Sequence, residues 1–346
     1  MTVRTRAQLN SDADTLLPDN TAGEISPEDV RERIKDLADS AKLAEDSATT
    51  SAQGIVELAT VAEALAGTDA VRAVTPSGLY YPTGHLFGLT LSNNGSDATN
   101  DIDIAAGTCR DGSDTQNLIC SAMTKQLDAN WAPGTNAGGR YSGVAIANGT
   151  YHWYACGKAL GASQDYYAHP SGSTDAQVLA HLQAETGGSA YLYVRRIGSI
   201  IRASAAILPF VQTGDKFRLN TAIVDVNASS PGASAVTRTL STPAGLVTRA
   251  ILSVGMFYTT TRSSALVSPL TATDQAAQDP TVSSLTGFAQ VAGASNTVVG
   301  GWNFSAESEI ETNTSSQVRS RTSAGGASDR LGIVTFGWID TRGRAA

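Results

Sequence analysis

The side chains best suited to contact a ligand are aromatic rings in polar, glycine-rich surroundings. Trp131 lies in the loop-like run 130–136, Tyr166 and Tyr167 precede a His-Pro pair, and Trp302 follows two glycines. Flat rings stack on the apolar faces of sugars, while nearby amides and carboxylates bind the hydroxyls. We therefore predict glycan contact for Trp131, Tyr166, Tyr167 and Trp302. Loop packing or a subunit seam is the alternative for these rings.

The sequence gives little support for catalysis. It has no G-x-S-x-G elbow and no zinc-binding His-Glu-x-x-His, and Gly157-Lys158 lacks the upstream glycine of a phosphate loop. The four histidines share no spacing, and with 32 acidic residues some carboxylate pair is always available. We expect no enzyme, no catalytic residue and no cofactor.

A run of aspartates is rich enough in oxygen to suggest calcium, but its spacing matches no EF-hand loop. Aspartates that cap their own turns are the favoured interpretation, so no metal is expected. The run comprises Asp97, Asp101, Asp103, Asp111 and Asp114. Three cysteines, Cys109, Cys120 and Cys156, have no metal spacing and are interpreted as buried or free thiols. A bridge between Cys109 and Cys120 stays open.

Composition describes the scaffold that must position these residues. The 346 residues are 41% hydrophobic and 16% charged, which suits folded units and not a disordered tail. A net charge of −8 argues against a nucleic-acid partner. No apolar run reaches the length of a membrane span, and residues 1–6 do not resemble a secretory signal. The 33 glycines favour a β-rich fold.

Residues 1–50 form a polar, helical segment. Ser26-Pro27-Glu28-Asp29 is a typical helix start. The residues that follow at heptad spacing, Val30, Ile34 and Leu37, predict a narrow seam for partner helices. Packing of a single helix on its own chain is the alternative.

Residues 51–83 form a neck with too few apolar residues for a core of its own. Ile55, Val56 and Leu58 would be buried only if several copies of the chain associated. Thr60 is a candidate cap for a short helix that Gly67 ends.

From about residue 84 the pattern has period two, which predicts an antiparallel sandwich or jelly roll. We place one fibre module at 84–220 and the C-terminal part of the head at 221–346. Residues 191–202 are interpreted as two strands with a break at Gly198, and residues 175–182 as a helical insert. Trp153 and Trp338 are assigned to the core.

Three stretches carry a family resemblance. The run QGIVELATVAEALAGTDAVRAVTPSGL, residues 53–79, resembles the short repeat of phage tail-fibre proteins. The opening PDNTAGEISPEDVRERI is similar to openings of phage structural proteins. Between residues 101 and 219, runs such as YLYVRRIGSIIRA and ILPFVQTGDKF look like a module of phage and prophage fibre or tail proteins.

The resemblance implies a virion fibre or spike that attaches a phage or phage-like particle to a bacterial surface, with polysaccharide as the expected receptor. It further implies a homotrimer that docks onto other virion proteins through residues 1–50. The alternatives are a structural adaptor or capsid decoration, and a capsule-degrading tailspike enzyme. Whether the particle is a virus or a gene transfer agent, and whether the protein sits on its tail or its head, stays open.

Overall fold

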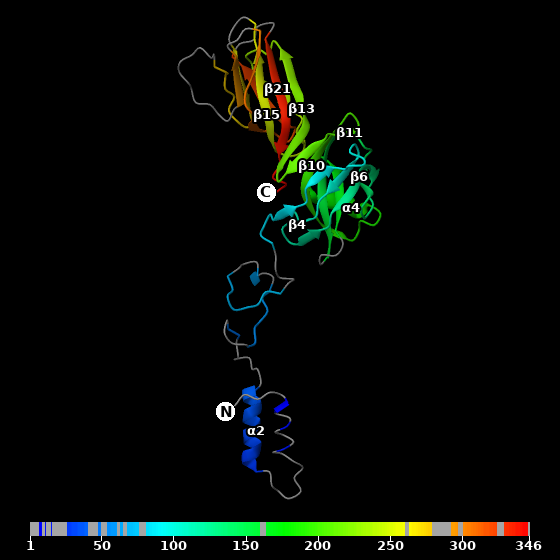
Figure 1. Ribbon diagram of the computed structural model, residues 1–346, viewed down its shortest axis with the longest axis vertical. Helices are drawn as coiled ribbons and strands as arrows, with labels where there is room; N and C mark the ends of the chain where they lie inside the picture. The colour runs from blue at the N-terminus through cyan, green and yellow to red at the C-terminus, as the bar shows by residue number, and fades with distance from the viewer. Residues whose placement is uncertain are drawn as a thin grey trace. The chain divides into compact units, whose positions relative to one another are not determined.

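The computed structural model describes residues 7–8, 11, 15, 26–40, 48–49, 54–60, 63–64, 68–75, 81–159, 164–259, 263–278, 292–296, 300–323 and 329–344. The contacts divide the chain into two units, Met1–Tyr80 and Tyr81–Ala346, close to the predicted end of the neck at residue 83. The protein is mainly β, with two short helices in its described part (Figure 1).

The first unit contains the predicted helix, α2 (Pro27–Ser40). Its start is the expected one, because the Asp29 N–H donates to Ser26 Oγ at 3.2 Å and the Ser26 N–H donates to Asp29 Oδ2 at 2.9 Å. The neck has a similar helix cap, in which the Thr60 N–H donates to Glu63 Oε2 at 2.9 Å. The predicted cap at Thr60 is confirmed, while Gly67 and residues 76–79 lie outside the described residues.

The second unit contains one helix, α4 (Asp175–Ala184), and all the named strands among its described residues. The first group comprises β1 (Leu86–Gly88), β2 (Leu91–Asn93), β3 (Asp101–Ile104), β4 (Gly107–Arg110), β5 (Asn117–Cys120), β6 (Met123–Asn130), β7 (Ala137–Arg140), β8 (Gly149–Lys158), β9 (Asp165–Pro170), β10 (Tyr191–Ala203) and β11 (Ala206–Ile207). The second comprises β12 (Phe210–Thr213), β13 (Lys216–Ser229), β14 (Val236–Thr239), β15 (Arg249–Phe257), β16 (Ser263–Ser268), β17 (Ala292–Asn296), β18 (Trp302–Phe304), β19 (Ser308–Glu311), β20 (Gln317–Thr322) and β21 (Arg330–Ile339).

The first group forms a three-stranded sheet, β1-β4-β5, and an eight-stranded sheet, β11-β10-β8-β9-β7-β6-β3-β2. The larger sheet is mixed, because β7 runs parallel to both β6 and β9, which differs from the antiparallel prediction. β10 is one continuous strand. Gly198 does not break it but lies at a bulge in its pairing with β8. α4 is the predicted helical insert, capped by Thr174 and Gln177.

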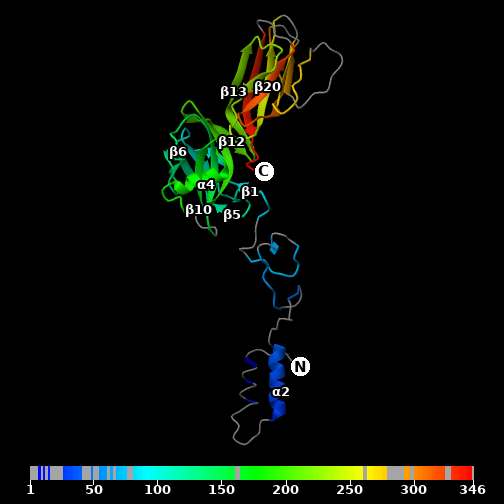
Figure 2. The same ribbon diagram turned by 180° about the vertical axis from the view of Figure 1, so that it is seen from behind.

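The second group forms a six-stranded sheet, in which β12-β13-β21-β15 continue to β18 and β19, and a four-stranded sheet, β14-β20-β16-β17 (Figure 2). The two sheets share one hydrophobic core, because Leu252 and Ile333 of the larger sheet pack with Val267 and Val318 of the smaller. The predicted boundary at residue 220 between the fibre module and the C-terminal part of the head falls inside β13. Because β13 pairs with β12, the boundary between the two groups of strands lies before β12 instead.

A buried ion pair joins the two groups of strands. The Arg196 guanidinium of β10 donates to Asp340 just after β21, with Nη2 2.8 Å from Oδ1, and the Arg342 N–H donates to the same oxygen. Burial alone would raise the pKa of Asp340, but the hydrogen bonds from Arg196 outweigh it and lower that pKa. The carboxylate therefore stabilises the fold in its charged form.

We expect Asp340→Ala to lower the free energy of unfolding by about 3–5 kcal/mol, because it leaves a buried guanidinium without its partner. The exposed pair Arg218–Glu307 is the control, and Glu307→Ala should cost at most about 1 kcal/mol. A lowered folded-state pKa means that this stabilisation is complete above the unfolded value of about 3.9 and is lost as the pH falls below it. Urea unfolding should therefore show the advantage of wild type over Asp340→Asn shrinking below about pH 4. Equal losses for Asp340→Ala and Glu307→Ala would contradict this assignment.

Candidate functional site

The strongest candidate site is a group of aromatic rings on the outer face of the six-stranded sheet. β18 pairs with β15 so that Phe304 lies opposite Gly255 and Trp302 opposite Phe257. Alternate residues of a strand share a face, so Trp302 and Phe304 lie together. Their ring centroids are 5.4 Å apart with planes at 21°, and the Phe257 ring lies 5.7 Å from Trp302. We call Phe257, Trp302 and Phe304 the aromatic platform.

Two glycines let these rings lie against the backbone of the sheet. Gly255 and Gly332 are cross-strand partners on β15 and β21. A Cβ atom at Gly255 would come within 2.3 Å of Phe304 Cε1, and one at Gly332 within 3.0 Å of Trp302 Cζ3. Any side chain at these positions would therefore push the rings outward. The rings stay accessible, with Trp302 42% and Phe304 46% exposed.

Charged side chains lie farther along the same sheet. Arg218 and Glu307 form a two-pronged ion pair, with Arg218 Nη1 2.9 Å from Glu307 Oε2, and the hydrogen bonds from Arg218 lower the pKa of Glu307. The Arg218 guanidinium also lies 5.4 Å from the centre of the Phe336 ring. An apolar surface with charged hydrogen-bonding groups on the same sheet suits a ligand that has both C–H faces and hydroxyls.

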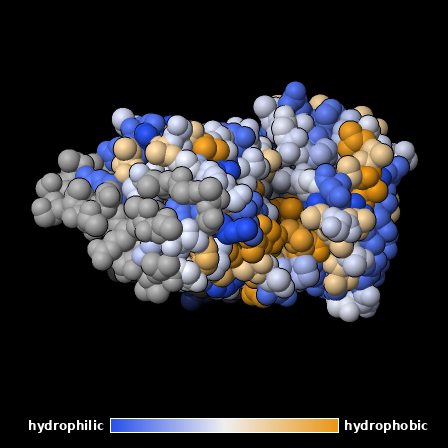
Figure 3. All heavy atoms as spheres, turned by 90° about the horizontal axis from the view of Figure 1, so that it is seen from above, coloured by the Kyte–Doolittle hydropathy of each residue, from blue (hydrophilic) through white to orange (hydrophobic). Residues whose placement is uncertain are grey.

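Hydrophobic side chains gather in groups on the surface. Seen from above, these groups lie among hydrophilic side chains, so no continuous apolar patch covers the visible face of the molecule (Figure 3). Trp302 and Phe304 are the exposed large hydrophobic residues of β18. Exposed apolar groups of this kind mark binding surfaces more often than isolated exposed residues do.

Trp302 should be the only tryptophan that a collisional quencher reaches readily. The chain has four tryptophans, and Trp131, Trp153 and Trp338 are buried. We expect acrylamide to quench one fraction of the fluorescence strongly, and Trp302→Phe to remove that fraction with no loss of thermal stability. A glycan on the platform should protect the same fraction. An unchanged quenchable fraction in Trp302→Phe would contradict the exposure of this ring.

The prediction of an exposed loop ring at Trp131 is wrong. The residue is 4% exposed, and its Nε1–H donates to the Tyr166 carbonyl at 3.0 Å. Its ring packs edge-on against Tyr167 and Tyr191 at 6.2 and 5.6 Å. Trp131 is therefore part of a core, and no sugar can stack on it in this conformation.

The prediction of glycan contact for Tyr166 and Tyr167 is also wrong, because both residues lie in the internal strand β9 and are fully buried. Tyr166 donates its hydroxyl to the Ser121 carbonyl at 2.9 Å, and Tyr167 donates to Glu185 Oε1 at 3.2 Å. Burial raises the pKa of Tyr167. The hydroxyls of both rings are occupied, so Trp302 alone of the four predicted glycan contacts remains accessible. Trp153 and Trp338 are buried in the core, as predicted.

The predicted oligomer seam is apolar and open to solvent in the single chain. On α2, Ile34 and Leu37 are 62% and 58% exposed, and Val30 is exposed beside them. The predicted neck residues Ile55, Val56 and Leu58 are likewise exposed. Neither set is covered by the described residues of its own chain, so the prediction of packing between chains stays a prediction.

The other sequence candidates have structural roles. Asp97 accepts the backbone N–H groups of Thr99 and Asn100, and Asp111 accepts those of Ser113 and Gln116, which confirms both as turn caps. All three cysteines are buried free thiols, so Cys109 and Cys120 are not bridged. Within the described residues, no three His, Cys, Asp or Glu side chains are placed to hold a metal. No helix there is long and apolar enough to cross a membrane.

Sequence reasoning identified Trp302 but missed Phe257 and Phe304. The alternation of aromatic residues at 302 and 304 after a glycine pair was the available signal, since it places two rings on one face of a strand. Phe257 carried no such signal, because its place beside Trp302 depends on the pairing of β15 with β18.

Comparison with known proteins leaves the chain without an assigned family. No protein-family model matches it, and no curated protein is significantly similar to it in sequence.

Proposed function

We propose that this protein is a fibre or spike protein of a tailed phage or phage-like particle, and that it attaches the particle to polysaccharide on a bacterial surface. The aromatic platform is the observation that carries the proposal, because exposed rings over a glycine floor are suited to stacking on sugar rings. The resemblance of residues 53–79 to the tail-fibre repeat supplies the biological setting.

The proposed architecture is a homotrimer. Residues 1–50 dock onto other virion proteins, three necks associate, and the head presents its outer sheet face as a β-sandwich. The exposed apolar residues of α2 and the neck support this arrangement, because association would remove them from water. Several weak sites on one particle then act together, which multiplies the affinity.

A third exposed apolar row supports association in the head. Phe87 of β1 lies opposite Thr108 of β4, which lies opposite Ile119 of β5, so the three side chains share one face of the three-stranded sheet. Phe87 and Ile119 are exposed on that face. A neighbouring copy of the chain would cover the row in the proposed trimer.

The test is binding of the full-length chain to an immobilised panel of purified bacterial capsules and lipopolysaccharide O-chains. The proposal expects retention on at least one polysaccharide, competition by the same polysaccharide in solution, and no released oligosaccharide. Release of oligosaccharides would replace it with a capsule-degrading tailspike. Absence of binding to every polysaccharide and to intact bacteria would favour an adaptor or capsid decoration.

A further inference from the structure

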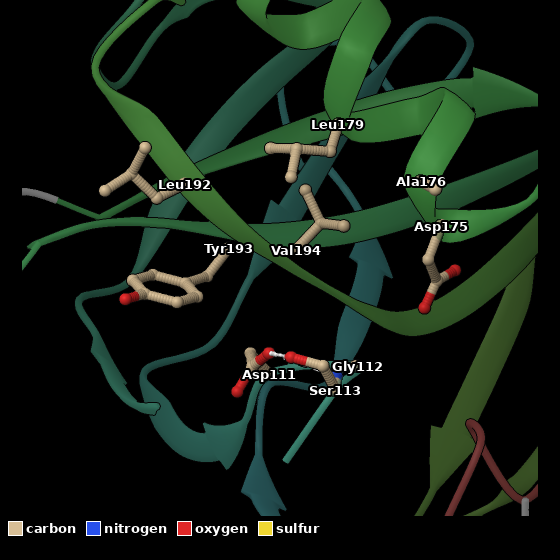
Figure 4. Close-up of a pocket in the computed structure, with 9 residues that line it drawn as sticks. All are labelled: Asp111, Gly112, Ser113, Asp175, Ala176, Leu179, Leu192, Tyr193 and Val194. Atoms are coloured by element: carbon tan, nitrogen blue, oxygen red, sulfur yellow. Dashed lines mark hydrogen bonds between the residues drawn. The ribbon is translucent and has the colours of Figure 1, made fainter. Parts of the chain in front are cut away.

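A separate hollow lies where the start of β10 passes the beginning of α4 and the turn after β4. It has a volume of about 270 Å³ and is formed by residues 111–113, 175, 176, 179 and 192–194 (Figure 4). Small-molecule pockets generally range from about 300 to 1,000 Å³. The volume of the hollow is just below this range, which limits a ligand there to about one small ring and excludes a long oligosaccharide.

One wall of the hollow is apolar. Leu179 of α4 and Leu192, Tyr193 and Val194 of β10 line it, and Leu192 is exposed at its rim. Figure 4 shows the Tyr193 ring on one side of the hollow and the Asp175 carboxylate on the other. A ligand in this space would contact the hydrocarbon of Leu179 and Leu192 on one side and a carboxylate on the other.

The two carboxylates at the hollow differ in their hydrogen bonding. Asp111 is occupied by its own turn, since it accepts the N–H groups of Ser113 at 3.0 Å, Thr115 at 2.6 Å and Gln116 at 2.5 Å. The Asp175 side chain has no hydrogen bond or ion pair to the described part of the chain. Its acceptor oxygens are free for a ligand, whereas those of Asp111 are not.

The position of the Asp175 carboxylate depends on the absence of a side chain at residue 112. A Cβ atom at Gly112 would lie 2.4 Å from Asp175 Oδ2. The Gly112 N–H donates to the Val194 carbonyl at 2.8 Å, which fixes the turn against β10. Burial raises the pKa of Asp175, although the positive charges of Arg196 and Arg195 oppose this shift. Asp175 is nevertheless an exposed residue, so its carboxylate oxygens can be reached by a ligand, and the described part of the chain does not use them.

The charges around the hollow favour a neutral ligand. The carboxylates of Asp111 and Asp175 line the hollow, and the positive charges of Arg195 and Arg196 act on Asp175 from behind this lining, so a ligand of either sign would meet a like charge. Neutral hydroxyl groups can donate to the carboxylate without either penalty, and such charge-assisted hydrogen bonds are strong.

We propose that this hollow is a binding site for a single neutral sugar ring, whose hydroxyls donate to Asp175 and whose C–H face packs on Leu179 and Leu192. The choice of a sugar as ligand rests on the proposed function, but the site is distinct from the aromatic platform. The two sites together would let one head contact two residues of a surface glycan.

Saturation-transfer NMR with the full-length protein tests the site. The probes are glucose, galactose, mannose, rhamnose and N-acetylglucosamine, with glucosamine and glucuronic acid as charged probes. We expect at least one neutral sugar to bind, and Asp175→Asn and Gly112→Ala each to weaken it at least tenfold. Asp128→Asn, which removes an exposed carboxylate elsewhere on the same group of strands, should leave this binding unchanged. Circular dichroism of each variant checks that α4 and the fold are kept.

The proposal is overturned if no neutral sugar binds, if Asp175→Asn binds as well as wild type, or if glucosamine or glucuronic acid binds more tightly than every neutral sugar. Monosaccharide binding that is lost in Trp302→Ala and kept in Asp175→Asn would also overturn it, because binding would then belong to the platform. The two proposals can fail separately. If no polysaccharide of the panel binds but a monosaccharide binds in a way that depends on Asp175, the attachment function is wrong and the sugar site in the hollow is retained.

Discussion

Replacement of Trp302 by alanine is expected to weaken binding to polysaccharide about thirtyfold or more per site while leaving the fold intact. The ring is the central member of the platform, since it stacks on Phe304 and contacts Phe257. Buried aromatic anchors in interfaces commonly contribute 2 kcal/mol or more, about a thirtyfold loss per site. Because several sites act together on one particle, the loss in the assembled form should exceed that of a single site.

The matched control is Val211→Ala, which removes an exposed apolar side chain from β12 of the same sheet. It should bind as wild type does. Surface plasmon resonance on the polysaccharide selected by the panel gives both affinities, and thermal denaturation shows that neither variant is destabilised. Equal binding by Trp302→Ala and wild type would remove the platform from the attachment mechanism.

Local signals predicted the elements whose cause is local. The Ser26–Asp29 cap begins its helix as expected, because a cap is complete within four residues of sequence. Period-two alternation likewise identified the strand β21 around Trp338. Each of these features needs no information from distant parts of the chain.

The failed site predictions depended on distant partners. Trp131 and Tyr166 stand beside polar residues, which made their segments look like loops. Asp165, beside Tyr166, is itself buried: it lies 2.9 Å from Lys125 Nζ, and that ammonium also donates to the Ala132 and Gly134 carbonyls. A polar run can therefore be interior when residues far along the chain satisfy it, and local sequence does not reveal this.

The aromatic platform is a second feature that local sequence could not reveal. Gly255 and Gly332 are ordinary strand glycines in sequence, and only strand pairing brings them together beneath two rings. The sequence could mark Trp302 as a candidate for ligand contact, but it could not show that the surface beneath this ring has no side chains.

The second large effect is expected on the α2 seam. The double variant Ile34→Glu, Leu37→Glu should convert an assembly of three chains, each of 35.7 kDa, into single chains or a loosened neck assembly. Both side chains are more than half exposed in the single chain, and in the proposed trimer they would be buried at heptad positions. Glutamate side chains at these positions would repel one another across the seam, and the hydrophobic contact between the helices would be lost.

Light scattering coupled to size-exclusion chromatography measures the mass, and Val247→Glu, at an exposed apolar position outside the seam, should leave it unchanged. The same double variant should bind polysaccharide surfaces 10²–10⁴-fold more weakly if it separates the chains, since linked sites gain about that factor from acting together. Its binding to a monosaccharide should stay at the wild-type level, because the head itself is untouched. A wild-type protein that runs as one chain of 35.7 kDa at micromolar concentration would refute the trimer outright. Attachment would then have to rest on the affinity of one head, which a weak single-ring contact cannot supply.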